Sequence, residues 1–118
     1  MKATEDRVLR ERLLRKLRVR RTVGEGTTAK VPLWAWRVGD ALLVGQPNEA
    51  YSDLQQALRF FHWDRPVVSM NLCNGSIGYL CPEELHAQDI YQVWQSPFER
   101  GSLERLIGAA AEATRRLE

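Results

Sequence analysis

Two oxygen-bearing side chains, a carboxylate and a phenol, follow the ends of two apolar runs. Glu49 comes shortly after the run 41–45, and Tyr79 ends the loop 73–79 that follows the run 67–72. Each has an ordinary structural role open to it. Glu49 would offset the dipole of a helix that it begins, and Tyr79 would pack its amphipathic ring beside a loop. Their value as a ligand-binding pair depends on whether the fold places them side by side.

The loop before Tyr79 contains the segment NGSIG (74–78). Its two glycines allow a positive φ angle and a close approach of the backbone to a ligand. Asn74 and Gly75 are therefore candidate substrate-binding residues, although a tight structural turn accounts for such glycines equally often. The sequence contains no P-loop, no HExxH zinc motif and no GxSxG nucleophile motif.

The histidines and cysteines are weaker candidates. His62 follows the second predicted helix at the amino edge of the sheet, so we expect a surface or helix-end residue. His86 lies close enough to Tyr79 in sequence to approach the site, but a single histidine beside a loop is usually structural. Cys73 and Cys81 are too few for a disulfide framework and lack CxxC spacing. We expect reduced thiols and no cysteine-based zinc site.

Hydrophobic periodicity and turn residues predict the elements that position these groups. The first helix is expected at 5–20, with a leucine stripe formed by Leu9, Leu13, Leu14 and Leu17. A Gly/Thr connector at 22–29 is followed by a strand at 31–38, a Gly39–Asp40 turn and a strand at 41–45. We then expect a helix that is capped by Asn48 or Ser52 and runs to about Phe61, a strand at 67–72 and an irregular stretch at 73–101. Ser102 is expected to cap a final helix, which has these hydrophobic residues on one side: Leu103, Leu106, Ile107, Ala110 and Leu117.

These elements predict an α/β fold: a small sheet with a hairpin and a parallel strand–helix–strand unit, flanked by N- and C-terminal helices. The run 41–45 is wholly apolar, which indicates burial on both faces of the sheet. A single crossover helix makes strands 41–45 and 67–72 parallel, with a right-handed connection. Their carboxyl ends then share one edge, where open α/β sheets bind ligands. We therefore expect Glu49 and Tyr79 to converge on one cleft.

Length and composition indicate a single globular domain over residues 1–118, with a basic helix at 1–21 and an α/β segment at 31–118. The chain has 118 residues, of which 44% are hydrophobic and 27% are charged. These values exclude a disordered chain, a collagen and a disulfide-dense miniprotein. No apolar run is long enough for a transmembrane segment, and no secretory signal is visible. We expect a cytoplasmic location, which an upstream extension would change.

Charge is distributed unevenly along the chain. Residues 1–21 contain nine basic and three acidic residues, a net charge of +6, whereas the remainder carries −4. A basic arm of this kind binds nucleic acid or an anionic membrane, or else forms a solvated helix that packs on acidic surface nearby. We favour the solvated helix, because the arm has no aromatic residue to stack on a base. Nucleic-acid binding through 7–21 is the weakest hypothesis, and strong salt dependence of DNA or heparin retention would support it.

The stretch from about Val31 to Leu117 resembles the C-terminal part of the catalytic domain of neutral/alkaline (non-lysosomal) ceramidases. The residues that carry the resemblance are LLVGQPNEAYSDL (42–54), NLCNGSIGYLCPEEL (71–85), QDIYQVWQSPF (88–98) and GSLERLIGAAAEATRRL (101–117). The resemblance implies a zinc-dependent amidohydrolase that cleaves the N-acyl amide bond of ceramide-type lipids.

In that family, Glu49 and Tyr79 would match two ligands of the catalytic zinc. Tyr91, twelve residues after Tyr79, would match a tyrosine that stabilises the developing oxyanion. Asn48 stands where the family usually has glycine and Gln92 where it usually has glutamate, so the substrate pocket would differ. The family's two histidine ligands lie in an N-terminal part that this sequence lacks. A catalytic zinc takes three protein ligands, so we expect weak or no zinc binding and no activity by the chain alone.

The missing half of such a site would come from a longer chain, a partner chain or a second copy. The competing hypothesis is a non-catalytic binding or assembly module on the same α/β scaffold. It is supported by the basic arm and by four tryptophans in a chain too short to bury them all, namely Trp34, Trp36, Trp63 and Trp94. A three-stranded sheet with helices would also leave apolar surface uncovered where the rest of the ceramidase-type domain would pack, so we expect self-association or poor solubility.

Overall fold

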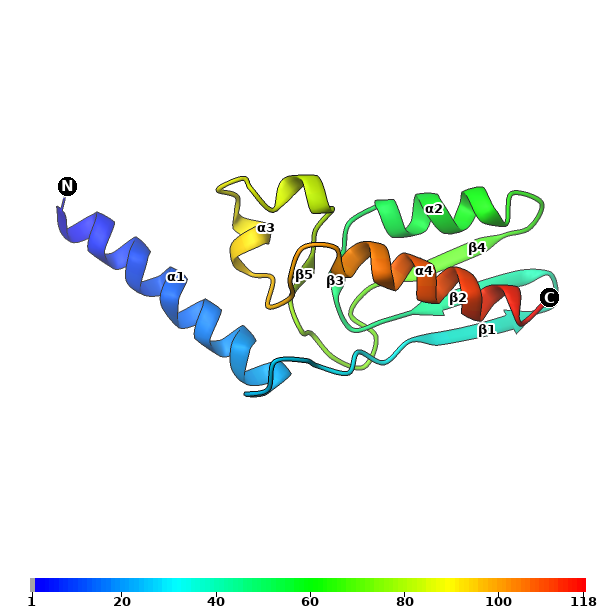
Figure 1. The fold of residues 1–118 in the computed structure, drawn as a ribbon, viewed down its shortest axis with the longest axis horizontal. Helices are drawn as coiled ribbons and strands as arrows, with labels where there is room; N and C mark the ends of the chain where they lie inside the picture. The colour runs from blue at the N-terminus through cyan, green and yellow to red at the C-terminus, as the bar shows by residue number, and fades with distance from the viewer. Residues whose placement is uncertain (1) are drawn as a thin grey trace.

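A three-stranded sheet with two helices on one face forms the body of the protein (Figure 1), which a computed structural model describes over residues 2–118. The strand order is β1-β2-β4. The central strand β2 pairs antiparallel with β1 and parallel with β4, and helix α2 makes the crossover. The bounds are Trp34–Val38 for β1, Ala41–Gly45 for β2, Asp53–Phe61 for α2 and Val67–Met70 for β4. The predicted α/β class, hairpin and parallel unit are confirmed.

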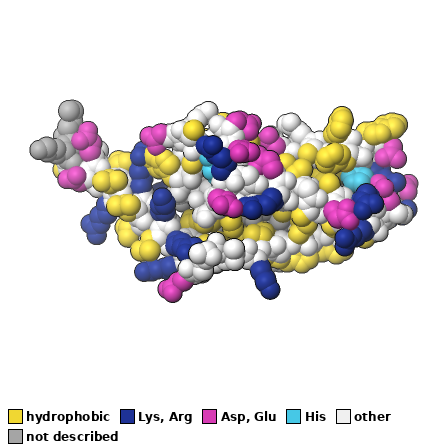
Figure 2. All heavy atoms as spheres, in the orientation of Figure 1, with side chains coloured by type: hydrophobic (Ala, Val, Ile, Leu, Met, Phe, Trp, Pro, Cys, Tyr) yellow, Lys and Arg dark blue, Asp and Glu magenta, His cyan; other side chains and the backbone are white. Residues whose placement is uncertain are grey.

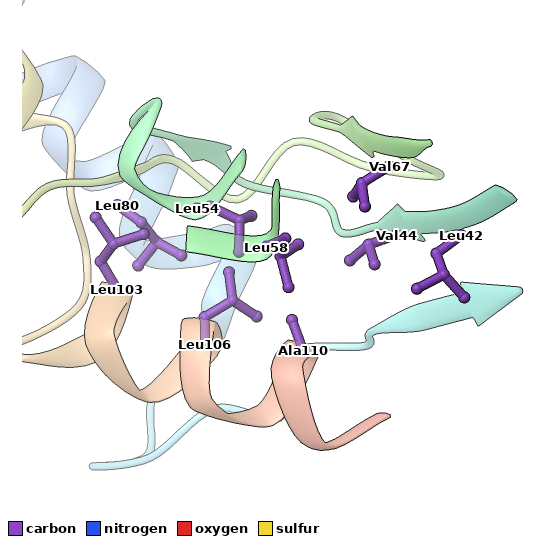
Figure 3. Packing of buried hydrophobic residues seen from close by; sticks show 9 residues of the cluster. All are labelled: Leu42, Val44, Leu54, Leu58, Val67, Leu80, Leu103, Leu106 and Ala110. Atoms are coloured by element: carbon purple, nitrogen blue, oxygen red, sulfur yellow. The ribbon is translucent and has the colours of Figure 1, made fainter. Parts of the chain in front are cut away.

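The hydrophobic core lies between this sheet and helices α2 and α4 (Ser102–Arg115), as Figure 3 shows. Alternate residues of a strand point to opposite faces, so Leu42 and Val44 of β2 point toward the helices. The core comprises Leu42, Val44, Leu54, Leu58, Val67, Leu80, Leu103, Leu106 and Ala110. On the other face of β2 Gly45 is buried, but Ala41 and Leu43 are only half-buried, so the expectation of burial on both faces is met only in part.

A second, two-stranded sheet lies beyond the carboxyl ends of β2 and β4 and was not expected from the sequence. Its parallel strands are β3 (Glu49–Ala50) and β5 (Tyr79–Leu80). The stretch 73–101, predicted to be irregular, also contains the 3-10 helix η1 (Glu83–Leu85) and the short helix α3 (Tyr91–Trp94). Elements of two to four residues carry no measurable hydrophobic period, which explains the error.

Several predicted boundaries shift for local reasons. The strand expected at 31–38 begins only at Trp34, after Pro32, and the strand expected at 67–72 ends at Met70. Gly101, with φ of 85°, occupies the N-cap of α4, so Ser102 is its first helical residue and not its cap. Ser52 holds the N-cap position of α2 without a side-chain cap bond, and Asn48 lies upstream of the helix.

Helix α1 (Lys2–Val23) extends from the body along the long axis of the molecule, and the two termini lie at opposite ends (Figure 1). It is longer than predicted, and its leucine stripe is solvent-exposed. Arg12 stacks over the ring of Trp94, with 3.1 Å between the guanidinium carbon and the ring centroid. Arg15 donates a 3.2 Å hydrogen bond to the Tyr91 hydroxyl. The helix contacts the body through these aromatic residues; its expected solvent exposure is confirmed over residues 3–18, and its packing on acidic surface stays a prediction.

Lys and Arg side chains are interspersed with hydrophobic ones along α1 (Figure 2). Across residues 2–118, no helix combines the length and the apolar character that spanning a bilayer requires.

Candidate functional site

Strands β3 and β5 place Glu49 directly beside Tyr79. The two residues are register partners in the parallel pair. The Glu49 amide donates to the Gly78 carbonyl at 3.1 Å, and the Tyr51 amide donates to the Leu80 carbonyl at 3.1 Å. The prediction that the parallel unit brings Glu49 and Tyr79 to one edge is confirmed. Glu49 does not begin α2, so its expected alternative role in the first helical turn is wrong; Asp53 occupies that turn.

The side chains on one face of this small sheet form a polar row. Residues two apart in a strand share a face, which groups Glu49 with Tyr51 and Tyr79 with Cys81. The Tyr79 side chain neighbours that of Glu49, and the Tyr51 side chain neighbours the Cys81 thiol. Tyr91, from α3, packs edge-on against Tyr79 with 5.9 Å between ring centroids. The structure thus gathers Glu49, Tyr79 and Tyr91, three residues that the sequence singles out.

Buried amide side chains hold this sheet in place. The Gln46 Oε1 accepts from the Asn48 amide at 2.6 Å, and its Nε2 donates to the Asn71 Oδ1 at 2.6 Å. Asn71 in turn donates to the Ala50 carbonyl at 3.0 Å, and Asn48 Nδ2 donates to the Gly78 carbonyl at 3.2 Å. Gln46 and Asn48 are fully buried. Sequence reasoning missed Gln46 and Asn71, although amides directly after two apolar strands were a usable signal.

Gly78 is the glycine on which the local geometry depends. Its φ is +96°, and a Cβ atom there would lie 2.5 Å from the Gln95 carbonyl oxygen. That same oxygen accepts from the Tyr79 amide at 3.2 Å. Asn74 and Gly75 lie exposed at the loop tip, with positive φ at Asn74 and not at Gly75. Their assignment to substrate binding stays a prediction.

The electrostatics of the row disfavour an ionised phenol. Burial raises the pKa of Tyr79 above its ordinary value, and the neighbouring Glu49 carboxylate raises it further, as a charge and as a hydrogen-bond partner. Burial also raises the pKa of Tyr51 and of the Cys81 thiol. A zinc-bound phenolate requires the opposite shift, which a metal ion would itself provide.

The donor set falls short of an ordinary zinc centre. Over residues 2–118, no three His, Cys, Asp or Glu side chains cluster to hold a metal ion. Glu49 and Tyr79 supply one carboxylate and one phenol, whereas a catalytic zinc takes three protein ligands. Both cysteines are free, Cys81 being buried. His86 follows η1 and is half-buried.

His62 is a structural residue at the other end of the body. Its Nδ1 lies 2.9 Å from the Glu118 Oε1, and its Nε2 lies 2.8 Å from the Thr114 Oγ1. His62 is 4% exposed. The expected helix-end position is correct, because His62 is the C-cap of α2, but the expected surface location is wrong.

Replacement of Glu49 by glutamine is expected to lower the pKa of Tyr79 part of the way back toward about 10, because the carboxylate charge is lost while burial remains. NMR pH titration of tyrosines labelled at Cζ measures this, with the Tyr79 signal assigned by Tyr79→Phe. Glu5→Gln, on the exposed surface of α1, is the control and should leave the titration unchanged.

The same shift has a consequence for stability. The pKa of Tyr79 is higher in the folded than in the unfolded state. The contribution of Tyr79 to the free energy of unfolding is therefore complete below about pH 10 and is lost as the pH rises through the folded pKa. An unchanged Tyr79 titration in Glu49→Gln would contradict the proximity of the two groups.

Comparisons with known proteins support the fold. No family model matches the sequence, and no curated protein matches it. The structure is similar to the crystal structure of neutral ceramidase from Pseudomonas aeruginosa, with a TM-score of 0.53 and 18% sequence identity. The match covers 71% of this chain and 15% of that chain. At this identity the similarity shows a ceramidase-like fold, and this chain corresponds to a small part of the larger protein.

Proposed function

We propose that this chain provides one half of a ceramidase-like amidohydrolase site. Glu49 and Tyr79 serve as two zinc ligands, Tyr91 as the oxyanion donor, and Asn74 and Gly75 as substrate contacts. The observation that carries the proposal is the parallel register of Glu49 with Tyr79. The substrate class is a ceramide-type lipid amide, whose cleavage yields a fatty acid and a sphingoid-type amine.

The surroundings of Tyr91 suit the role of a hydrogen-bond donor. Arg15 donates to the Tyr91 hydroxyl oxygen, which leaves the Tyr91 O–H free to donate to another acceptor. The edge-on contact with Tyr79 fixes the plane of the ring. A fixed donor stabilises an amide carbonyl oxygen as negative charge develops on it during attack. Sequence reasoning did not identify Arg15 as a contact of this tyrosine.

The other half of the site must supply nitrogen ligands. Two protein ligands hold zinc weakly, so the chain alone should bind little metal and show no turnover. We propose that the remaining ligands come from a longer polypeptide or from a partner chain. Zinc, when held in a complete site, supplies an acidified water and polarises the amide carbonyl.

A zinc complex that already carries two imidazole ligands tests this proposal. It replaces the missing nitrogen donors, so we expect it to bind wild type and to generate the ultraviolet difference spectrum of tyrosinate. Glu49→Gln and Tyr79→Phe should each weaken binding of the complex more than tenfold, because each removes one of the two zinc ligands that the chain supplies. Tyr51→Phe, which alters the neighbouring tyrosine of the same row, should bind as wild type does.

Two results would overturn the proposal. Equal binding of the complex by wild type and Glu49→Gln would show that the carboxylate is not a ligand. Stoichiometric zinc by elemental analysis, together with ceramide hydrolysis by the isolated chain, would show that the site needs no second half.

The second candidate function is a non-catalytic assembly module on the same scaffold. It is favoured by the exposure of Trp36 and Trp63, which are 46% and 85% exposed. Failure of the zinc complex to bind wild type would favour this function over the first.

A further inference from the structure

The face of the three-stranded sheet opposite α2 and α4 is apolar and is exposed at Trp36, Val38 and Val68, whereas the Cys73 side chain lies against Gly45 at one end. The pairings align Trp36 with Leu43, and Leu43 with Val68, in one row across all three strands. Paired residues point to the same face of a sheet. A second row aligns Trp34, Gly45 and Met70, and at the other end Val38 aligns with Ala41. We call these residues the open sheet face.

The orientation of this face follows from its neighbours in sequence. Arg37, between Trp36 and Val38, points to the helix side, where its guanidinium lies 3.4 Å from the Leu117 carbonyl oxygen beyond α4. Leu42 points into the core on that same side. Trp36, Val38 and Val68 are 46%, 63% and 44% exposed. Val38 and Val68 therefore lie on the uncovered side together with Trp36.

The composition of the open sheet face is that of a buried surface. All of its residues are uncharged, and two are tryptophans. Exposed contiguous apolar surface marks an interaction site. A partner that covers this face would itself be apolar and flat.

We propose that the open sheet face is a dimer interface on which a second copy of this chain packs, sheet against sheet. A twofold axis near Trp36 brings two identical uncharged surfaces together, and no ion is buried. Two sheets pack about 10 Å apart with interdigitated side chains, and tryptophan is a frequent anchor of such contacts. A patch on the order of 500 Å² per subunit is toward the low end for specific interfaces, so we expect a reversible dimer.

Charge argues against the other apolar surface as the contact between copies. The leucine stripe of α1 is also exposed, with Leu9 and Leu13 at 56% and 60%. However, α1 carries nine basic and three acidic residues, so two copies of it repel each other. The open sheet face has no charged residues, so two copies of it do not repel each other. Its residues are distinct from Glu49, Tyr79 and Tyr91, so the dimer does not rest on the proposed catalytic role.

Sedimentation velocity over a range of concentrations tests the dimer. Wild type should move from monomer toward dimer as the concentration rises. Trp36→Glu places a charge at the centre of the interface and should raise the dissociation constant at least tenfold. Trp63→Glu is the matched control: this tryptophan lies outside the strands, in the turn after α2, and should dimerise as wild type does. If Trp36→Glu fails to fold by circular dichroism, Val68→Glu takes its place.

The outcomes are distinct. A wild-type chain that is monomeric at every concentration would overturn the inference, and so would a monomer that instead sediments with anionic lipid vesicles. A dimer that Leu13→Glu dissociates and Trp36→Glu does not would place self-association on α1 and would also overturn it.

Discussion

Replacement of Leu58 by alanine is expected to lower the free energy of unfolding by about 3 kcal/mol. Leu58 is fully buried on α2, where its side chain points between the sheet and α4 (Figure 3). Alanine would leave a cavity among Val44, Leu106 and Ala110, because the sheet and α4 on either side can move into the vacated space only in part. In a domain of this size such a loss is a large share of the total stability.

Urea unfolding followed by circular dichroism measures this effect. Leu9→Ala is the control, because Leu9 has the same side chain in a helix and is 56% exposed. Its replacement should change the free energy of unfolding by less than about 0.5 kcal/mol. Equal losses for Leu58→Ala and Leu9→Ala would mean that α1 packs as tightly as the core does.

Replacement of Gly78 by alanine is expected to lower the free energy of unfolding by at least about 2 kcal/mol and to disturb the Glu49–Tyr79 pair. A side chain is strained at φ of +96°, and the new Cβ would lie 2.5 Å from the Gln95 carbonyl oxygen, which belongs to the backbone. The Gly78 carbonyl accepts hydrogen bonds from the Glu49 amide and from Asn48 Nδ2, so any shift reaches β3 directly.

Gly75→Ala is the matched control for Gly78→Ala. A Cβ at Gly75 would lie 3.5 Å from the Pro47 Cβ, an ordinary contact, and its φ is not positive. We expect a stability change within about 0.5 kcal/mol and an unchanged Tyr79 titration. Thermal unfolding and the Cζ signal of Tyr79 report the two effects separately. A Gly78→Ala variant as stable as Gly75→Ala would contradict the described loop geometry.

Long periodic segments were predictable from the sequence because their pattern repeats. The spacing of Leu54 and Leu58 predicts α2, and that of Leu103, Leu106 and Ala110 predicts α4. In both helices these residues are buried. The Gly39–Asp40 turn makes β1 and β2 antiparallel, and the helical crossover makes β2 and β4 parallel, so the directions of the three main strands were predictable. The same periodicity could not show how far each face of a strand is covered, which is why burial of the second face of β2 was overestimated.

The site was only partly predictable. Its location at the strand ends follows from the parallel crossover, and this alone was enough to pair Glu49 with Tyr79. The two-residue strands that fix their register carry no sequence period. The contact of Arg15 with Tyr91 joins residues 76 positions apart, and nothing local to either residue indicates it.

The loop between β4 and β5 is attached at both of its ends to the chain segment beside it. The amides of Leu72 and Cys73 donate to the carbonyls of Asn48 and Gln46, and the amide of Ile77 donates to that of Pro47. Only residues 74–76 project freely. Extra residues inserted there would lengthen the tip at small entropic cost and leave the strand register unchanged. This scaffold can therefore diversify by changes in loop length, and the tip at 74–76 is the natural place to graft a foreign peptide.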